Sequence, residues 1–117
     1  MKHCAPKGIR MTQDQITEAA VRALLDAAPK GSRVILFGSR ARGTARPDSD
    51  LDFLVIEPEV EDRFGEIFRL RQAVEEVLGD TVQPVDLVVT DQERFEKSRN
   101  TPNTLAFEAA TTGRMYG

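Results

Sequence analysis

Apolar residues recur at two different spacings along the chain, and these spacings predict helices that alternate with short strands. From Gln13 to about Ala28 they fall three and four positions apart, as on one face of a helix. Thr12 and Gln15 form a capping-box pattern at the start of this helix. The face is rich in alanine, which indicates close packing on a sheet, with a partner-binding surface as the alternative. Its members are Ile16, Ala19, Ala20, Ala23, Leu24 and Ala27.

Three short apolar runs predict the strands of a sheet. They cover residues 33–37, 51–56 and 84–89, and they are rich in β-branched and aromatic residues. Glycine, serine and proline bound them, as is typical of buried strands. Pro58 ends the second run, because proline is poorly placed within a strand ladder.

A second long helix is predicted to begin at Asp62. Gly79 marks its end, because glycine is favoured just after the last residue of a helix. Its apolar positions predict one buried stripe along the helix. The members of this stripe are Phe64, Ile67, Phe68, Val74, Val77 and Leu78.

The last part of the chain predicts shorter elements. A short helix runs through residues 93–95, capped by Thr90 or Asp91. Another helix covers residues 105–110 and ends by Gly113, and residues 114–116 form a short edge strand. Together these elements predict an α/β (α+β) fold, with a small mixed sheet and helices mainly on one face.

Size and composition are those of one globular domain. The 117 residues are 40% hydrophobic and 30% charged. We expect a disordered or frayed tail over residues 1–11 and one domain over residues 12–117. No apolar stretch approaches the roughly 20 residues of a membrane span, and no apolar signal core follows the basic start, so we expect a cytoplasmic protein without membrane contact. The single cysteine, Cys4, excludes an internal disulfide.

Charge is unevenly distributed. The formal net charge of −3 argues against stable DNA binding, which normally needs a basic surface. Between Arg33 and Pro47, however, the chain carries arginines at positions 33, 40, 42 and 46 and no acid. A basic stretch within an acidic protein favours a small polyanionic ligand.

An acidic pair follows this stretch. Asp50 and Asp52 are two positions apart at the start of a predicted strand, so their side chains project to the same side. Adjacent carboxylates repel each other, and a divalent cation such as Mg²⁺ relieves that repulsion. Upstream, the turn of Gly38 and Ser39 offers backbone N–H groups and a hydroxyl to a phosphate. Metal ligands beside a phosphate cradle suggest nucleotidyl or phosphoryl transfer.

Asp86 interrupts the third apolar run. It is either a strand-end residue facing solvent or a third metal ligand or general base beside Asp50 and Asp52. The acidic pair upstream favours the functional alternative.

These residues carry a resemblance to a known family. Gly38-Ser39, the spaced Asp50-x-Asp52 pair and Asp86 together resemble the DNA polymerase β-like nucleotidyltransferase superfamily, and more narrowly its minimal nucleotidyltransferases. The resemblance implies that Gly38 and Ser39 hold the β- and γ-phosphates of ATP, the substrate. It also implies that the three aspartates bind two Mg²⁺ ions, and that Asp86 helps to deprotonate the attacking hydroxyl.

Arg42 is a candidate phosphate clamp, and the alternative is a surface arginine that pairs with Asp48. We therefore predict catalytic and metal-binding roles for Asp50, Asp52 and Asp86, and nucleotide binding by Gly38, Ser39 and Arg42.

The resemblance also implies a partner. Minimal nucleotidyltransferases commonly accompany a helical HEPN-type toxin, which implies an antitoxin that transfers AMP to that toxin, on a tyrosine. A homodimer or hetero-oligomer would supply the acceptor site that the short chain lacks. Two alternatives stay open: a nucleotidyltransferase with a small-molecule acceptor, as in aminoglycoside-modifying relatives, and a non-catalytic antitoxin that acts by binding alone.

Overall fold

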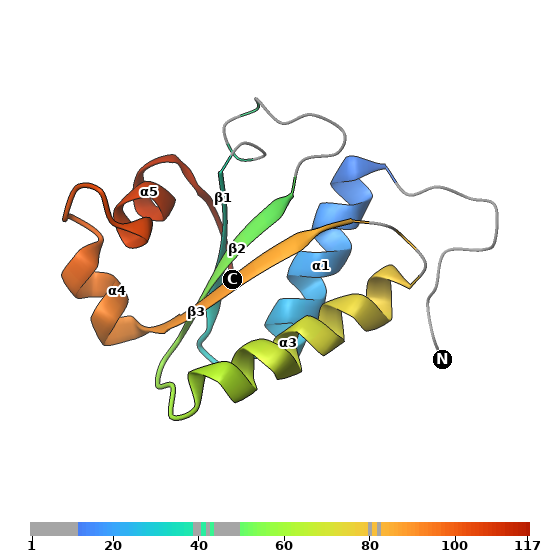
Figure 1. Cartoon of the computed structure of the whole chain (residues 1–117), viewed down its shortest axis with the longest axis horizontal. Coiled ribbons are helices and arrows are strands. Elements are labelled where there is room, and N and C mark those ends of the chain that lie inside the picture. Colours follow the sequence, from blue (N-terminus) through green and yellow to red (C-terminus); the bar gives the residue numbers. More distant parts are fainter. Residues whose placement is uncertain (1–11, 39–40, 42, 44–49, 80, 82) are drawn as a thin grey trace.

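The structure is a computed structural model, and it describes residues 12–38, 41, 43, 50–79, 81 and 83–117. In this part of the chain, four strands form one mixed sheet in the order β3-β2-β1-β4 (Figure 1). Strand β1 (Arg33–Phe37) pairs antiparallel with β2 (Leu51–Glu57) and with β4 (Arg114–Tyr116). Strand β3 (Val85–Asp91) runs parallel to β2. The predicted tail, residues 1–11, lies outside the described residues.

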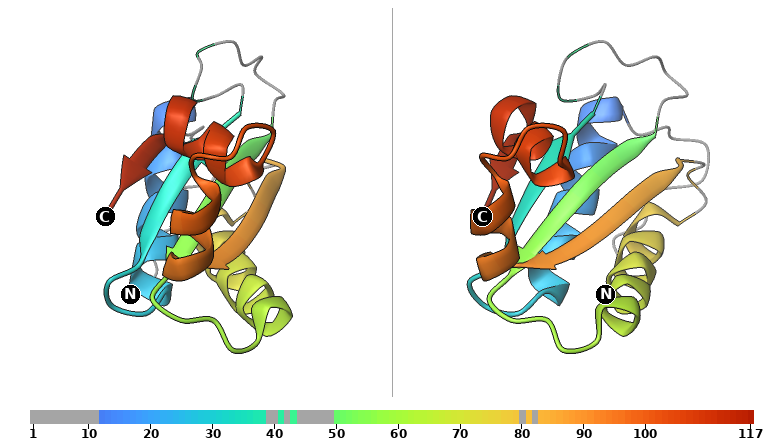
Figure 2. Two further views of the ribbon diagram at one scale, coloured as in Figure 1. Left: turned by 90° about the vertical axis from the view of Figure 1, so that its left-hand side faces the viewer. Right: turned by 60° about the vertical axis from the view of Figure 1, so that its left-hand side comes forward.

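Helices cover both faces of this sheet. The two longer helices, α1 (Gln13–Ala27) and α3 (Arg63–Leu78), lie on one face, and the shorter α4 (Gln92–Ser98) and α5 (Leu105–Thr112) lie on the other (Figures 1 and 2). The predicted α/β fold with a small mixed sheet is confirmed, and its longer helices share one face.

The two helical layers explain why the strands are almost continuously apolar. Alternate residues of β1 and β2 enter two different cores, for example Val34 and Phe53 beneath α1 and α3, and Ile35 and Leu54 beneath α4 and α5. A sheet that is covered on both faces needs apolar residues at every position along its strands.

Two helices begin with caps that the sequence predicted, and a third begins at the predicted residue. Thr12 and Gln15 form the capping box of α1, with the Gln15 amide donating to Thr12 Oγ1 over 3.1 Å. Asp62 is the N-cap of α3. For α4 the sequence allowed Thr90 or Asp91 as the cap, and the structure shows Asp91, which accepts a hydrogen bond from the Arg94 amide over 2.7 Å. Among the described residues, no helix has the length and apolar content needed to cross a membrane.

The predicted stripe on α3 is wrong at three positions. Phe64 is 84% exposed and Phe68 is 64% exposed, and Val77 is also open to solvent. The helix is instead turned so that a narrow face packs on the sheet and on α1, and Leu70, absent from the predicted stripe, is fully buried on it. This leaves two large aromatic side chains on the surface.

Candidate active site

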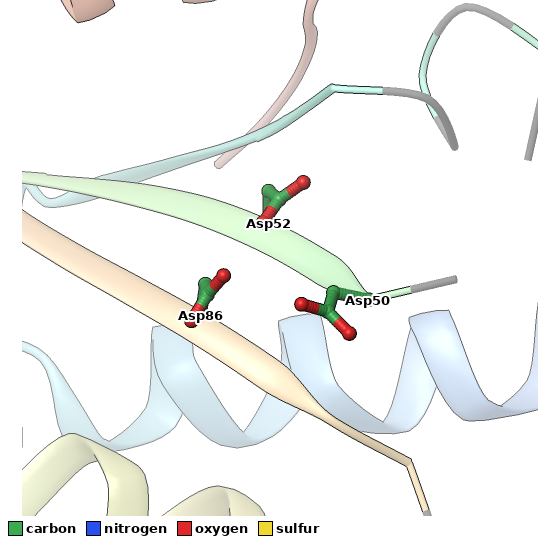
Figure 3. Close-up of side chains that lie close together, drawn as sticks. All are labelled: Asp50, Asp52 and Asp86. Carbon is green, nitrogen blue, oxygen red and sulfur yellow. The ribbon is translucent and has the colours of Figure 1, made fainter. Parts of the chain in front are cut away.

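Parallel pairing of β2 and β3 brings the three predicted aspartates together. In the register of these strands Asp52 lies opposite Asp86, and Asp50 directly precedes β2. One carboxylate oxygen from each residue lies within 4.8 Å of the other two (Figure 3). Residues that are far apart in the sequence thus form one cluster at the start of both strands.

The carboxylate of Asp52 has a raised pKa. Its pKa is raised from 3.8 to about 6, mainly because partial burial desolvates it, and also because of the nearby charge of Asp86 and a side-chain hydrogen bond with Asp86. Smaller contributions in the same direction come from Asp50 and Glu108. Each of these interactions disfavours the charged form of Asp52, so a positive charge within the cluster would stabilise it.

Gly38 lies close against the side chain of Asp52. It follows β1, whose last residue, Phe37, pairs with Asp52, and it has a φ of +79°. A Cβ atom at this position would collide with Asp52 Oδ2 and lie 3.4 Å from Asp52 Cγ. Glycine therefore allows the turn and leaves room for the carboxylate. The phosphate-binding role of Gly38 stays a prediction, and Ser39 and Arg42 lie outside the described residues.

Glu108 is a member of this neighbourhood that the sequence did not indicate. It is an exposed residue of α5, and its negative charge contributes to the raised pKa of Asp52. No local motif marks it, because its approach to Asp52 depends on how α5 packs across β1.

The composition of the cluster fits a hard divalent cation. Asp50, Asp52 and Asp86 each offer a carboxylate oxygen, which is the ligand type that Mg²⁺ prefers. A cation held between them would also offset the repulsion that raises the pKa of Asp52. The described residues thus provide three carboxylate ligands for one metal ion.

Comparison with known proteins identifies relatives of this arrangement. The family model of the nucleotidyltransferase domain matches residues 18–108. Among solved structures, a chain of a toxin–antitoxin structure determined with AMP-PNP is 26% identical over 86% of this chain and 72% of its own length, with a TM-score of 0.55. Among curated proteins, no sequence matches the chain.

Two further structures share the fold. A chain from a double mutant of the toxin–antitoxin MntA–HpeT is 23% identical over 92% of this chain and 74% of its own length, with a TM-score of 0.54. A putative nucleotidyltransferase from Sulfolobus solfataricus is 23% identical over 70% of this chain and 69% of its own length, with a TM-score of 0.52. At this identity the similarity concerns the fold alone.

Proposed function

This chain belongs to the nucleotidyltransferase domain family, and from that premise we propose that it is a Mg²⁺-dependent enzyme that transfers AMP from ATP to a HEPN-type toxin and acts as its antitoxin. One observation carries the proposal: Asp50, Asp52 and Asp86 meet at one point of the sheet, within 4.8 Å of one another. A purely structural role would not require three carboxylates to be crowded together at a cost in electrostatic energy.

The proposed roles follow the arrangement of the site. Asp50, Asp52 and Asp86 would hold Mg²⁺, as two ions, and the bound metal would neutralise negative charge on the phosphates. Gly38, Ser39 and Arg42 would hold the β- and γ-phosphates of ATP. These groups orient the α-phosphorus toward the acceptor.

The proposed step then balances as a single displacement. The acceptor hydroxyl gives its proton to the carboxylate of Asp86, and its oxygen forms a bond to the α-phosphorus. The bond between the α-phosphorus and the bridging oxygen of pyrophosphate breaks. The products are an AMP-modified acceptor and pyrophosphate.

The choice of acceptor rests on the relatives. The 26% identical chain comes from a toxin–antitoxin structure that contains AMP-PNP, an analogue of ATP, which supports an adenine nucleotide and a protein partner. The HEPN class of that partner, and a tyrosine as its acceptor, come from the resemblance to minimal nucleotidyltransferases. The complex would be a hetero-oligomer in the cytoplasm.

A labelling experiment tests this function. The purified chain is incubated with α-³²P-ATP, Mg²⁺ and a lysate of its source organism, beside the variant Asp50→Asn/Asp52→Asn and a reaction with γ-³²P-ATP. We expect a labelled protein band with the wild type and α-label only, and mass spectrometry of that band identifies the acceptor and the modified residue.

Other outcomes point to the alternatives. Label on a small molecule would favour the small-molecule transferase and contradict protein modification. If Asp52→Asn still protects cells from the toxin, protection by binding alone replaces the enzymatic proposal.

A further inference from the structure

One side of α3 carries two exposed phenylalanines and leads into a cavity. Four residues share this side of the helix, because they are spaced by four, three and four positions: Phe64, Phe68, Arg71 and Glu75. All four are exposed, and the last two also line a cavity of about 430 Å³. At 1.5 Å per residue, the stripe is about 16 Å long. An apolar surface and a cavity thus lie end to end along one helix.

Two arginine side chains show which way this side of α3 faces. Arg69 donates to the Ala27 carbonyl oxygen at the end of α1 over 2.6 Å, and Arg71 donates to the Val85 carbonyl oxygen at the start of β3 over 3.3 Å. Residues two positions apart lie about 200° apart around a helix, so α1 and β3 flank α3 on opposite sides. The stripe, on the side of Arg71, therefore borders β3, which runs beside α3 in Figure 2.

The cavity lies where the second half of α3 meets the start of β3. Its apolar walls are formed by Val74, Leu78, Pro84 and Val85. Val74 and Leu78 are themselves buried, so the walls are part of the packed fold. Deep apolar cavities next to exposed aromatic side chains are where protein partners insert anchor residues. We call the stripe and the cavity together the α3 groove.

The outward peptide groups of β3 are not available to a partner in this groove. The Val85 carbonyl oxygen already accepts from Arg71, and Leu87 and Val89 are only 7% and 1% exposed. An occupant must therefore satisfy its own backbone donors and acceptors, which an α-helix does within itself. The α3 groove thus favours a helix over an added strand.

Charge selects between a second copy of the chain and another protein. Residues 59–79, which contain α3, are more acidic than basic. The acidic ones are Glu59, Glu61, Asp62, Glu66, Glu75 and Glu76, and the basic ones are Arg63, Arg69 and Arg71. Two copies paired along α3 would bring two acidic surfaces together, whereas a basic partner would be attracted.

We propose that the α3 groove binds an amphipathic, basic α-helix of the acceptor protein. The inference rests on the proposed transferase function for the identity of the occupant. One apolar side chain of the helix fills the cavity, and apolar residues one and two turns away cover Phe68 and Phe64. Lysine or arginine residues beside these anchors face the acidic residues around the groove, such as Glu61 and Glu75.

The α3 groove lies next to the carboxylate cluster without being part of it. Val85 lines the cavity, and Asp86 follows it directly on β3. Successive residues of a strand project to opposite faces, so Asp86 carries its carboxylate on the other face of the sheet. A helix docked in the groove therefore leaves the active site free, and a neighbouring segment of the same protein can pass around the edge of β3 to Asp86.

A binding experiment without nucleotide or metal tests the groove separately from catalysis. A display library of helical peptides of about 20 residues is selected on the purified full chain. It varies the anchor positions i, i+4 and i+7 among apolar residues and the flanking positions among lysine, glutamate and glutamine. We expect enriched peptides to be basic at the flanks. A central proline should weaken their binding at least about 100-fold, because proline breaks a helix.

Matched variants test the apolar stripe. Phe64→Ser/Phe68→Ser should weaken binding of an enriched peptide at least about tenfold, because two aromatic contacts are lost. Met115→Ser removes an exposed apolar side chain from the other edge of the sheet and should bind like the wild type.

A second pair of variants tests the charge. Glu75→Arg reverses a charge in the cavity and should weaken binding at least about fivefold at low salt, and less at high salt. Glu93→Arg makes the same change on α4, on the opposite face of the sheet, and should bind like the wild type.

The acceptor protein identified by AMP labelling links the groove to catalysis. Phe64→Ser/Phe68→Ser should raise the KM for that protein at least about tenfold and leave kcat unchanged, because the groove holds the acceptor and takes no part in the displacement. Thermal melts establish that each variant is folded.

Four results would overturn the inference: no enriched peptide, binding that survives the central proline, unchanged affinity of the phenylalanine variant, or an unchanged KM for the acceptor. Self-association of the chain that the phenylalanine variant abolishes would identify a second copy as the occupant instead. Peptide binding together with failed AMP transfer would contradict the proposed function and leave the α3 groove intact as a docking surface.

Discussion

Carboxylates crowd together at both ends of β2, and the two clusters are neutralised in different ways. At the end of the strand, Glu57 is 2% exposed, and its pKa is raised to about 8 because burial desolvates it and because it shares a hydrogen bond with Glu66. Arg69 binds Glu66, with 2.6 Å between Nη2 and Oε2, and donates through Nη1 to the Ala27 carbonyl oxygen. One shared proton and one guanidinium thus offset the negative charge of this cluster within the chain, although Glu57 Oε2 is buried without a hydrogen-bond partner.

The cluster at the start of β2 has no such compensation in the described residues. Every interaction that acts on Asp52, including those with Asp86 and Glu108, raises its pKa. A bound cation would supply the positive charge that the described residues do not place beside Asp52. We infer that the cluster at the end of β2 belongs to the fold and that the cluster at its start is arranged for binding. Four experiments can test this difference.

The largest effect is expected at the start of β2. Asp52→Asn should reduce AMP transfer at least about 1,000-fold, because a metal ligand is lost. Its melting temperature should be unchanged or higher, because the substitution removes a carboxylate whose charge is disfavoured in the folded state. Incorporation of α-³²P label and a thermal melt measure the two quantities. A melting temperature several degrees lower would show that this cluster stabilises the fold after all.

The second effect concerns pH and the end of β2. Because the folded pKa of Glu57, about 8, exceeds its ordinary value of 4.5, the folded state holds an extra proton between these values. The contribution of Glu57 to the free energy of unfolding is therefore greatest below about pH 4.5. This contribution falls as the pH rises and is lost above about pH 8.

Urea unfolding at about pH 5 and at about pH 8 measures this loss, which we expect to be on the order of 3 kcal/mol. Glu57→Gln should flatten the dependence on pH and keep AMP transfer near the wild-type rate. Equal slopes for the two proteins would mean that Glu57 is ionised in the fold.

The third effect separates backbone strain from crowding of the carboxylate. Gly38 and Gly43 have nearly equal φ values, +79° and +77°, but a Cβ at Gly43 meets nothing within 4 Å. Both Gly→Ala variants should lose about 1 kcal/mol of stability. Gly38→Ala should in addition lower AMP transfer at least about tenfold, because the methyl group displaces Asp52. Equal activities of the two variants would exclude a role for Gly38 in placing that carboxylate.

The smallest effect is stabilisation by the metal itself. With Mg²⁺ at about ten times its dissociation constant, the folded state gains about 1.4 kcal/mol, which raises the melting temperature by roughly 4–8 °C. Asp50→Asn/Asp52→Asn should show no such increase at matched ionic strength, whereas Glu57→Gln should respond like the wild type. A similar increase in the aspartate variant would place the metal elsewhere.

Much of the fold was accessible from local sequence patterns. Strands β1 and β3 and the caps of α1 and α4 follow from residue types within a few positions of one another. The meeting of Asp50 and Asp52 follows from strand alternation, and Asp86 was found because a carboxylate in so apolar a strand requires a reason.

Other features depend on tertiary packing that no local pattern records. On α3 the apolar residues spread around more than one side, so the sequence does not show which side faces the sheet; Leu70 is buried and Phe64 is not. Glu108 approaches Asp52 only because α5 folds back over β1. Ser39 and Arg42 stay predictions.

The pairing of β2 with β3 has a consequence for engineering. The distance between Asp52 and Asp86 is set by the register of the two strands. That register is set by apolar residues: Phe53 and Leu87 enter one core, and their neighbours Leu54 and Val88 enter the other. A slip of one residue would shift β3 by about 3.3 Å and turn Asp86 to the opposite face. Packing in the two cores thus fixes the spacing of the carboxylate cluster. Residues added to the connection between α3 and β3 should preserve the site. One residue added inside β3 should separate the carboxylates while the sheet still forms.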